Sequence, residues 1–85
     1  MTEHDLKTTS KFYQDVFLGI TTFIIRLNDK DFKVGDILHL MEIDDDGNYT
    51  GNSLRRIVTY TMTKKEHPGI LEKYIVMGID KIFEG

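Results

Sequence analysis

The sequence predicts an α+β domain that is mainly β, with one short N-terminal helix beside strands that form a small closed or half-closed barrel. The chain has 85 residues, enough for one domain and too few for two. One helical pattern precedes several runs rich in β-branched and aromatic residues. The connections between these runs are short, and a barrel leaves few unpaired strand edges. We therefore expect a single domain over residues 1–85.

The first strand and the helix are predicted near the N-terminus. Residues 4–8 form a short strand with Leu6 pointing inward. Residues 8–10 offer hydroxyl side chains for a helix N-cap, and residues 11–18 carry apolar side chains four positions apart. Gly19 stands where a left-handed residue commonly ends a helix. The pattern therefore predicts a helix that stops before Gly19.

The next strand is predicted over residues 21–27, a run of β-branched and aromatic residues. Side chains alternate along a strand, so two sets face opposite ways. We expect the core set to be Phe23, Ile25 and Leu27. The other set is Thr22, Ile24 and Arg26.

Later strands are predicted over residues 37–43, 54–63 and 74–83, because each is rich in residues that favour strands. Polar or glycine-containing connections separate them over residues 28–36, 44–51 and 64–71. Gly35 supplies a backbone angle that other residues resist. Asp46 and Gly47 form a strong turn signal.

Composition excludes several classes of function. The formal charge is −3, and the run Asp44, Asp45 and Asp46 accounts for that excess, so no basic stripe typical of a nucleic-acid binder is present. Without cysteine there is no disulfide, thiol nucleophile or cysteine zinc site. The chain has no signal-peptide pattern and no run approaching the roughly 20 apolar residues of a membrane helix. We expect a cytoplasmic protein without membrane contact.

Metal ligands are not predicted. Glu42, Asp44, Asp46 and Gly47 resemble the start of a calcium loop, but Ser53 stands where such loops need a bidentate glutamate. The histidines His4, His39 and His67 lack metal-binding spacing. We expect neither a metal nor a cofactor.

An ordered set of short motifs runs through most of the chain, from about His4 to Ile79. The motifs are His4-x-Leu-Lys7, Gly19, Thr22-Phe23, Ile25-Arg26, Asn28-Asp29, Asp31-Phe32-Lys33-Val34-Gly35-Asp36, Leu38-x-Leu40-x-Glu42, Tyr49-Thr50-Gly51 and Tyr74-Ile75-Val76-Met77-Gly78-Ile79. This set resembles the ASCH domains of the PUA-like superfamily, and most of all a short bacterial and phage subfamily of unassigned function. The resemblance implies a PUA-like β-barrel with the helix packed beside a cleft that binds RNA or modified nucleosides. Some ASCH relatives hydrolyse acylated cytidine.

The central ASCH motif, G-x-K-x-x-E-x-R, is only partly present. Gly19 and Arg26 match it, whereas Thr21 replaces the lysine and Ile24 replaces the glutamate. The lysine and threonine that the hydrolase relatives carry at these two positions are also missing. We therefore expect the family frame without catalytic residues.

Arg26 is the strongest single candidate for ligand binding. Ile24 cannot pair with it as a glutamate would, and a buried guanidinium without a partner is very costly. One interpretation is that Arg26 binds a phosphate or carboxylate. The other is a structural salt bridge with a loop aspartate, namely Asp29, Asp31 or Asp36.

Other candidates surround Arg26 in the sequence. The loop over residues 28–31 either recognises a base edge or only supplies turn chemistry. Lys7, Arg26, Lys30 and Lys33 either converge into a phosphate-binding patch or remain ordinary solvated charges. Among aromatic residues we expect Phe12, Phe17, Phe23 and Phe32 in the core, and leave Tyr49 open. The predicted set for a ligand or RNA is Arg26, Lys7, Asn28, Asp29, Lys30, His4 and Thr21.

Three functions remain open at this point. The leading one is a non-catalytic module that binds RNA or a nucleotide-like anion. The alternatives are an amidohydrolase acting on acylated cytidine or another small amide, and a prophage accessory domain that binds a protein. The sequence does not determine the ligand, the oligomeric state or the pathway.

Overall fold

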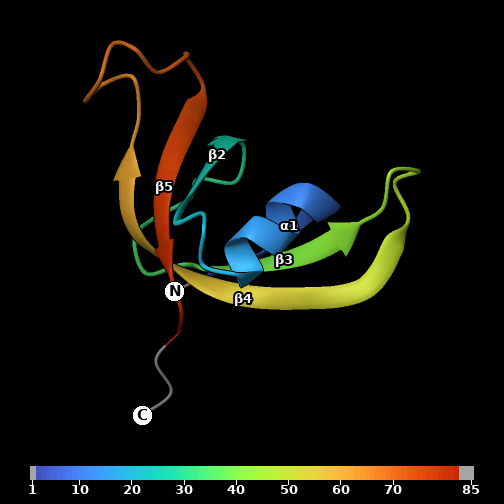
Figure 1. Ribbon diagram of the computed structural model, residues 1–85. Coiled ribbons are helices and arrows are strands. Elements are labelled where there is room, and N and C mark those ends of the chain that lie inside the picture. The colour runs from blue at the N-terminus through green and yellow to red at the C-terminus, as the bar shows by residue number, and fades with distance from the viewer. Residues whose placement is uncertain (1, 83–85) are drawn as a thin grey trace.

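The computed structural model describes residues 2–82, which contain five strands in one sheet and one helix (Figure 1). The elements are β1 (Glu3–Thr9), α1 (Ser10–Phe17), β2 (Phe23–Leu27), β3 (Ile37–Ile43), β4 (Tyr49–Met62) and β5 (Tyr74–Asp80). The strand order is β1-β3-β4-β5-β2. β1 pairs with β3 in parallel, and the other neighbours are antiparallel. The predicted α+β, mainly β, class is confirmed.

The sheet curls into a half-barrel because the long strand β4 bends and pairs with two different strands along its length. Its first half pairs with β3 and its second half with β5, and Ile57 stands opposite residues of both. The register shifts between Val58 and Tyr60, where an extra residue increases bend and twist. α1 packs against β1 and β3 on the concave side (Figure 1). β1 and β2 are the two edges and do not pair with each other, so the barrel stays open there.

The core fills the concave side of the sheet. Leu6 is buried there, as predicted. All five strands contribute, and α1 and the loop before β3 close the core with one residue each. Its members are Leu6, Val16, Ile24, Phe32, Leu38, Leu40, Val58, Ile75, Met77 and Ile79.

The prediction for the faces of β2 is wrong. Ile24 is 2% exposed, whereas Phe23, Ile25 and Leu27 are 52%, 55% and 45% exposed. Alternation holds, but the inward set is the one that contains Ile24 and Arg26. Both sets are largely apolar, so the pattern alone cannot choose between them. A charged side chain is tolerated on this inner face because β2 is an edge strand. The guanidinium of Arg26 therefore reaches the open side of the barrel and is not enclosed in the core.

The helix begins at Ser10 and ends at Phe17, before Gly19 as predicted. Gly19 has a φ of +77°, and its N–H donates to the Val16 carbonyl at 3.1 Å. The Ile20 N–H donates to the Asp15 carbonyl at 2.9 Å, which completes a Schellman motif. The predicted cap is only partly present, because the N-cap residue Thr9 makes no side-chain capping bond.

Two of the four predicted core phenylalanines lie elsewhere. Phe32 is buried and Phe12 packs partly buried against the core, but Phe17 is 59% exposed and Phe23 faces outward. Phe17 is the last residue of α1 and follows Val16, the helix residue that is buried in the core. The apolar pattern therefore extends beyond the buried part of the helix.

Most of the predicted strands are present in the structure, and the differences lie in the residues at which strands begin or end. β3 has the predicted bounds, while β4 begins at Tyr49, five residues early, because a tight turn lets pairing start at once. In that turn Gly47 has a φ of +83°, and the Asp44 carboxylate accepts from two backbone N–H groups. β5 ends at Asp80, and the predicted end at Phe83 lies outside the described residues. No helix in this part of the chain is long and apolar enough to span a membrane.

Candidate ligand-binding cleft

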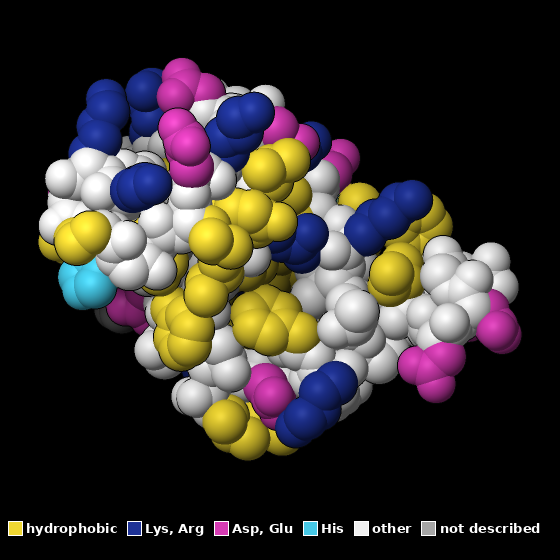
Figure 2. Space-filling view, turned by 90° about the horizontal axis from the view of Figure 1, so that it is seen from above, with side chains coloured by type: hydrophobic (Ala, Val, Ile, Leu, Met, Phe, Trp, Pro, Cys, Tyr) yellow, Lys and Arg dark blue, Asp and Glu magenta, His cyan; other side chains and the backbone are white. Residues whose placement is uncertain are grey.

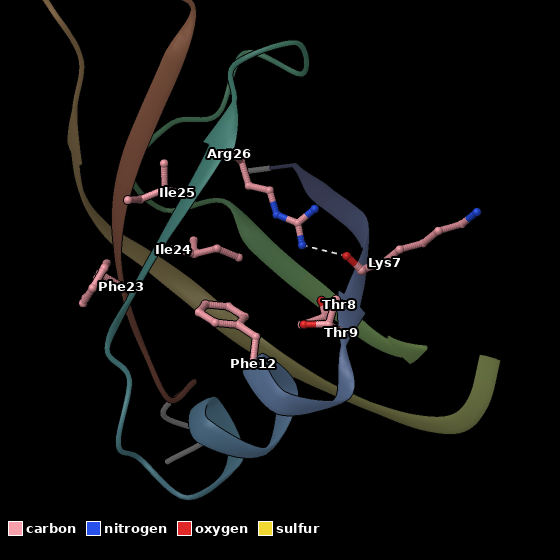
Figure 3. A pocket seen from close by; sticks show the side chains of 8 residues that line it. All are labelled: Lys7, Thr8, Thr9, Phe12, Phe23, Ile24, Ile25 and Arg26. Atoms are coloured by element: carbon pink, nitrogen blue, oxygen red, sulfur yellow. Dashed lines mark hydrogen bonds between the residues drawn. The ribbon is translucent and has the colours of Figure 1, made fainter. Parts of the chain in front are cut away.

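A cleft occupies the open side of the half-barrel, between the edge strands β1 and β2. Its volume is about 450 Å³, within the range typical of small-molecule sites. Residues of β1 form one wall, residues of β2 form the other, and Phe12 of α1 projects between them (Figure 3). The lining residues are Lys7, Thr8, Thr9, Phe12, Phe23, Ile24, Ile25 and Arg26.

Arg26 bridges the two walls of the cleft. Its Nη2 donates to the Lys7 backbone carbonyl at 2.7 Å, so β2 is tied to the free edge of β1 (Figure 3). No carboxylate among residues 2–82 forms an ion pair with Arg26. Burial lowers the pKa of Arg26 and nearby Asp29 raises it. A guanidinium has five N–H donors, so Arg26 keeps donors for a further acceptor in the cleft.

The remaining surface of the cleft is mostly apolar. Phe12 and Ile24 lie between the walls, with Phe23 and Ile25 along β2 (Figure 3). Figure 2 shows a hollow on this face with apolar side chains gathered beside it and Lys and Arg side chains close by. One cation beside flat apolar surfaces suits a ligand with an anionic group and a planar group.

Of the two interpretations of the four cations, ordinary solvated charge describes the three lysines, and only Arg26 directs its charge into the cleft. Lys7 lines the cleft, but its ammonium points away and lies 5.8 Å from the centre of the Tyr49 ring (Figure 3). Lys33 pairs with Asp31 at 3.4 Å, and neither Lys33 nor Lys30 lines the cleft. The direction of the Lys7 side chain follows from the alternation along β1. The even-numbered residues of this strand point inward, so Lys7 points outward. Arg26 is therefore the cation that the cleft presents.

His4 is buried and does not line the cleft. Its Nε2 lies 2.8 Å from Asp36 Oδ2, and its ring meets Phe32 edge-on at 4.7 Å between centroids. Burial opposes ionisation of Asp36, but bonds from His4 and from the backbone N–H groups of Lys33 and Thr2 outweigh it and lower the pKa of Asp36. Asp36 therefore belongs to this buried pair and does not hold Arg26.

The loop after β2 shows turn chemistry. Asn28 Oδ1 accepts from the Phe32 N–H at 3.2 Å, and Asp31 adopts a φ of +52°. Asp29 and Lys30 are exposed, and no residue of this loop lines the cleft. Thr21 also lies outside the cleft. Its backbone N–H donates to the carbonyl of Asp15, in the last turn of α1, at 3.1 Å. Of the seven predicted residues, the structure brings only Arg26 and Lys7 together here.

Sequence reasoning missed six of the eight lining residues. Three of them, Phe23, Ile24 and Ile25, precede Arg26 on β2. No local signal reveals the other three, Thr8, Thr9 and Phe12, because they come to face β2 only once β1 and β2 become the two edges of one curled sheet. The alternation of Leu6 and Thr8 indicates an inner face of β1. It does not indicate what lies opposite.

A group of possible metal ligands, Glu3, Asp5 and His39, comes together on the outer side of β1 and β3, with ligand atoms within 4.8 Å. These side chains already have partners. Arg55 Nε donates to Glu3 at 2.9 Å, and His39 Nδ1 lies 3.0 Å from Asp5. We interpret the group as a surface salt-bridge network.

Comparison with known protein families identifies the domain. A family described as a domain of unknown function, DUF3850, matches residues 3–79. The chain belongs to the DUF3850 family. This match spans α1, β1 to β4 and nearly all of β5, so both walls of the cleft lie within the DUF3850 domain. No curated protein matches the chain.

Proposed function

We propose that this DUF3850 domain is a non-catalytic module that binds RNA or a nucleotide-like anion in the cleft between β1 and β2. The observation that carries the proposal is Arg26, whose guanidinium faces an apolar cleft with no carboxylate paired to it among residues 2–82. We further propose that the domain is a PUA-like barrel of the ASCH type. A curled half-barrel with its helix beside the cleft supports this assignment.

A phosphate is the anion that best suits this geometry. A guanidinium binds phosphate through two parallel N–H donors, and such bonds are stronger where water is partly excluded. Phe12 projects between the two walls and offers an aromatic face on which an unstacked base can rest. The net charge of −3 predicts weak association at long range, so binding depends on this local interaction.

The lining of the cleft favours binding over amide hydrolysis. General acid–base catalysis needs a positioned group such as a histidine or carboxylate. The eight lining residues include no histidine or carboxylate, and the ammonium of Lys7, the one lining lysine, points away from the cleft toward Tyr49. Thr21 and Ile24 stand where the resembling ASCH hydrolases carry their catalytic residues. Ile24 is in the core and Thr21 lies outside the cleft, so these positions supply no acid or base either. We expect no turnover of acetylated cytidine, and measured turnover would overturn the non-catalytic assignment.

The test of binding compares Arg26→Ala with wild type on a labelled single-stranded RNA of mixed sequence. Fluorescence anisotropy between about 50 mM and 200 mM salt gives both the affinity and its salt slope. Losing one charged hydrogen-bonding group costs about 1.5–3 kcal/mol, so we expect Arg26→Ala to bind about tenfold or more weakly. The salt slope should fall by about 0.7 for each phosphate that the variant no longer neutralises.

Two control variants make the result specific. Lys64→Ala removes the same unit of charge from an exposed loop outside the cleft, and we expect wild-type binding. Arg26→Lys keeps the charge but loses the planar fork, so we expect intermediate affinity. Circular dichroism establishes that each variant is folded. RNA binding that is absent at low salt, or equal in wild type and folded Arg26→Ala, contradicts the proposal.

A further inference from the structure

A second, smaller pocket lies on the other side of α1, where the helix meets the start of β4. Its volume is about 190 Å³, and its lining residues are Tyr13, Gln14, Phe17 and Asn52. None of these residues lines the Arg26 cleft, so the two sites are independent. The volume is below the range of pockets that hold a complete drug-sized ligand, and it suits one flat ring.

Tyr13 has an unused polar group in this pocket. The residue as a whole is 6% exposed, and its hydroxyl forms no hydrogen bond within residues 2–82. No buried side-chain N or O atom in these residues lacks a partner, so the hydroxyl oxygen is the solvent-accessible end of the side chain. A hydroxyl in this position bonds to water, which an entering ligand can displace. Because Tyr13 lines the pocket, its hydroxyl is available to a molecule that enters.

A buried carboxylate behind the pocket orients its two amide side chains. Glu42 Oε1 accepts from Thr50 Oγ1 at 2.7 Å and from Asn52 Nδ2 at 3.0 Å, and Oε2 accepts from Gln14 Nε2 at 3.4 Å. The hydrogen bonds from Thr50 and Asn52 lower the pKa of Glu42. Glu42 is therefore ionised at neutral pH and accepts only.

The orientation of the two amides follows from this acceptor. Asn52 and Gln14 turn their NH₂ groups toward Glu42, so their carbonyl oxygens point away from it. Neither oxygen accepts a hydrogen bond from residues 2–82. The pocket therefore offers two carbonyl acceptors, one hydroxyl and the exposed ring of Phe17.

We infer that this pocket binds a nucleobase that carries an exocyclic amino group. The carbonyl oxygens of Gln14 and Asn52 accept from N–H groups of the base, which are the two amino hydrogens in cytidine and the amino and N1–H groups in guanosine. The Tyr13 hydroxyl donates to a ring nitrogen or carbonyl, and Phe17 stacks on the ring. Glu42 is a positioning residue, because it acts through the two amides. The inference goes beyond the proposed function, since it needs no phosphate and does not involve Arg26.

The test uses nucleosides, which lack phosphate, and ¹H–¹⁵N NMR spectra of the full chain. We expect cytidine or guanosine to shift the side-chain amide signals of Gln14 and Asn52. Uridine has no exocyclic amino group and should bind at least about fivefold more weakly, the value of roughly one hydrogen bond. Uridine binding as tightly as both amino nucleosides overturns the inference.

Two variants separate this role from a structural one. Tyr13→Phe removes only the unpartnered hydroxyl, so we expect an unchanged melting temperature and about fivefold weaker binding. Glu42→Gln replaces a pure acceptor with a group that also donates, so we expect altered amide signals and a similar loss. Arg26→Ala should leave nucleoside binding unchanged. Unchanged binding by Tyr13→Phe, or shifts confined to the Arg26 cleft, overturns the inference, and the second result leaves the proposed function standing.

Discussion

The two faces of β2 make a direct test of the fold, because adjacent isoleucines lie on opposite sides of it. Ile24 is 2% exposed within the core, and Ile25 is 55% exposed on the outer face. Ile24→Val and Ile25→Val remove the same methyl group from the same strand. Since isoleucine and valine both favour strands, the difference between the variants reports burial.

The expected magnitudes are well separated. Removing one buried methyl group by Ile→Val typically costs 0.5–1.5 kcal/mol, so we expect Ile24→Val to lose about 1 kcal/mol. For a domain of this size, that loss lowers the melting temperature by about 4–8 °C. Ile25→Val changes an exposed side chain and should stay within about 0.5 kcal/mol of wild type.

Urea unfolding followed by circular dichroism measures both variants, and equal m-values would show that the comparison is valid. Thermal unfolding gives a second, independent ranking. The reasoning is refuted if Ile25→Val is the more destabilised variant, because Ile25 would then occupy the core position. Equal losses would show that β2 does not divide into a buried and an exposed face.

Two further predictions concern the buried pair and the helix end. The pKa of Asp36 is lowered in the folded state, so its stabilising contribution is present above the unfolded pKa of about 3.9 and is lost as pH falls through the folded value. Asp36→Asn should therefore lower the free energy of unfolding by about 1–3 kcal/mol near neutral pH. In urea titrations this difference from wild type should shrink below about pH 4. A difference in unfolding free energy that stays constant with pH contradicts the prediction. Gly19→Ala places a side chain at a φ of +77° and should cost about 1–2 kcal/mol in thermal unfolding. Gly19→Asn should cost less because asparagine tolerates left-handed angles, and an equal cost argues against strain at Gly19.

The candidate sites were only partly predictable. Arg26 followed from the sequence because it stands two residues beyond an isoleucine where a resembling family has a glutamate. Its partner across the cleft, the Lys7 carbonyl, did not, because no pattern links a backbone group in β1 to a side chain in β2. The second pocket was missed for the same reason, since Glu42 meets Gln14 only when α1 packs on β3.

The sequence by itself determined the local structure: the helix that stops before Gly19, the bounds of β3, the turn at Asp46 and Gly47, and the alternation along β1 and β2. Local sterics and hydrogen bonding impose these features wherever the segment lies. Only the tertiary structure decided which face of β2 is buried and that β1 and β2 are unpaired edges with a cleft between them. Both faces of β2 carry apolar side chains, so the choice depends on the free energy of packing against distant strands, which a periodic pattern does not contain.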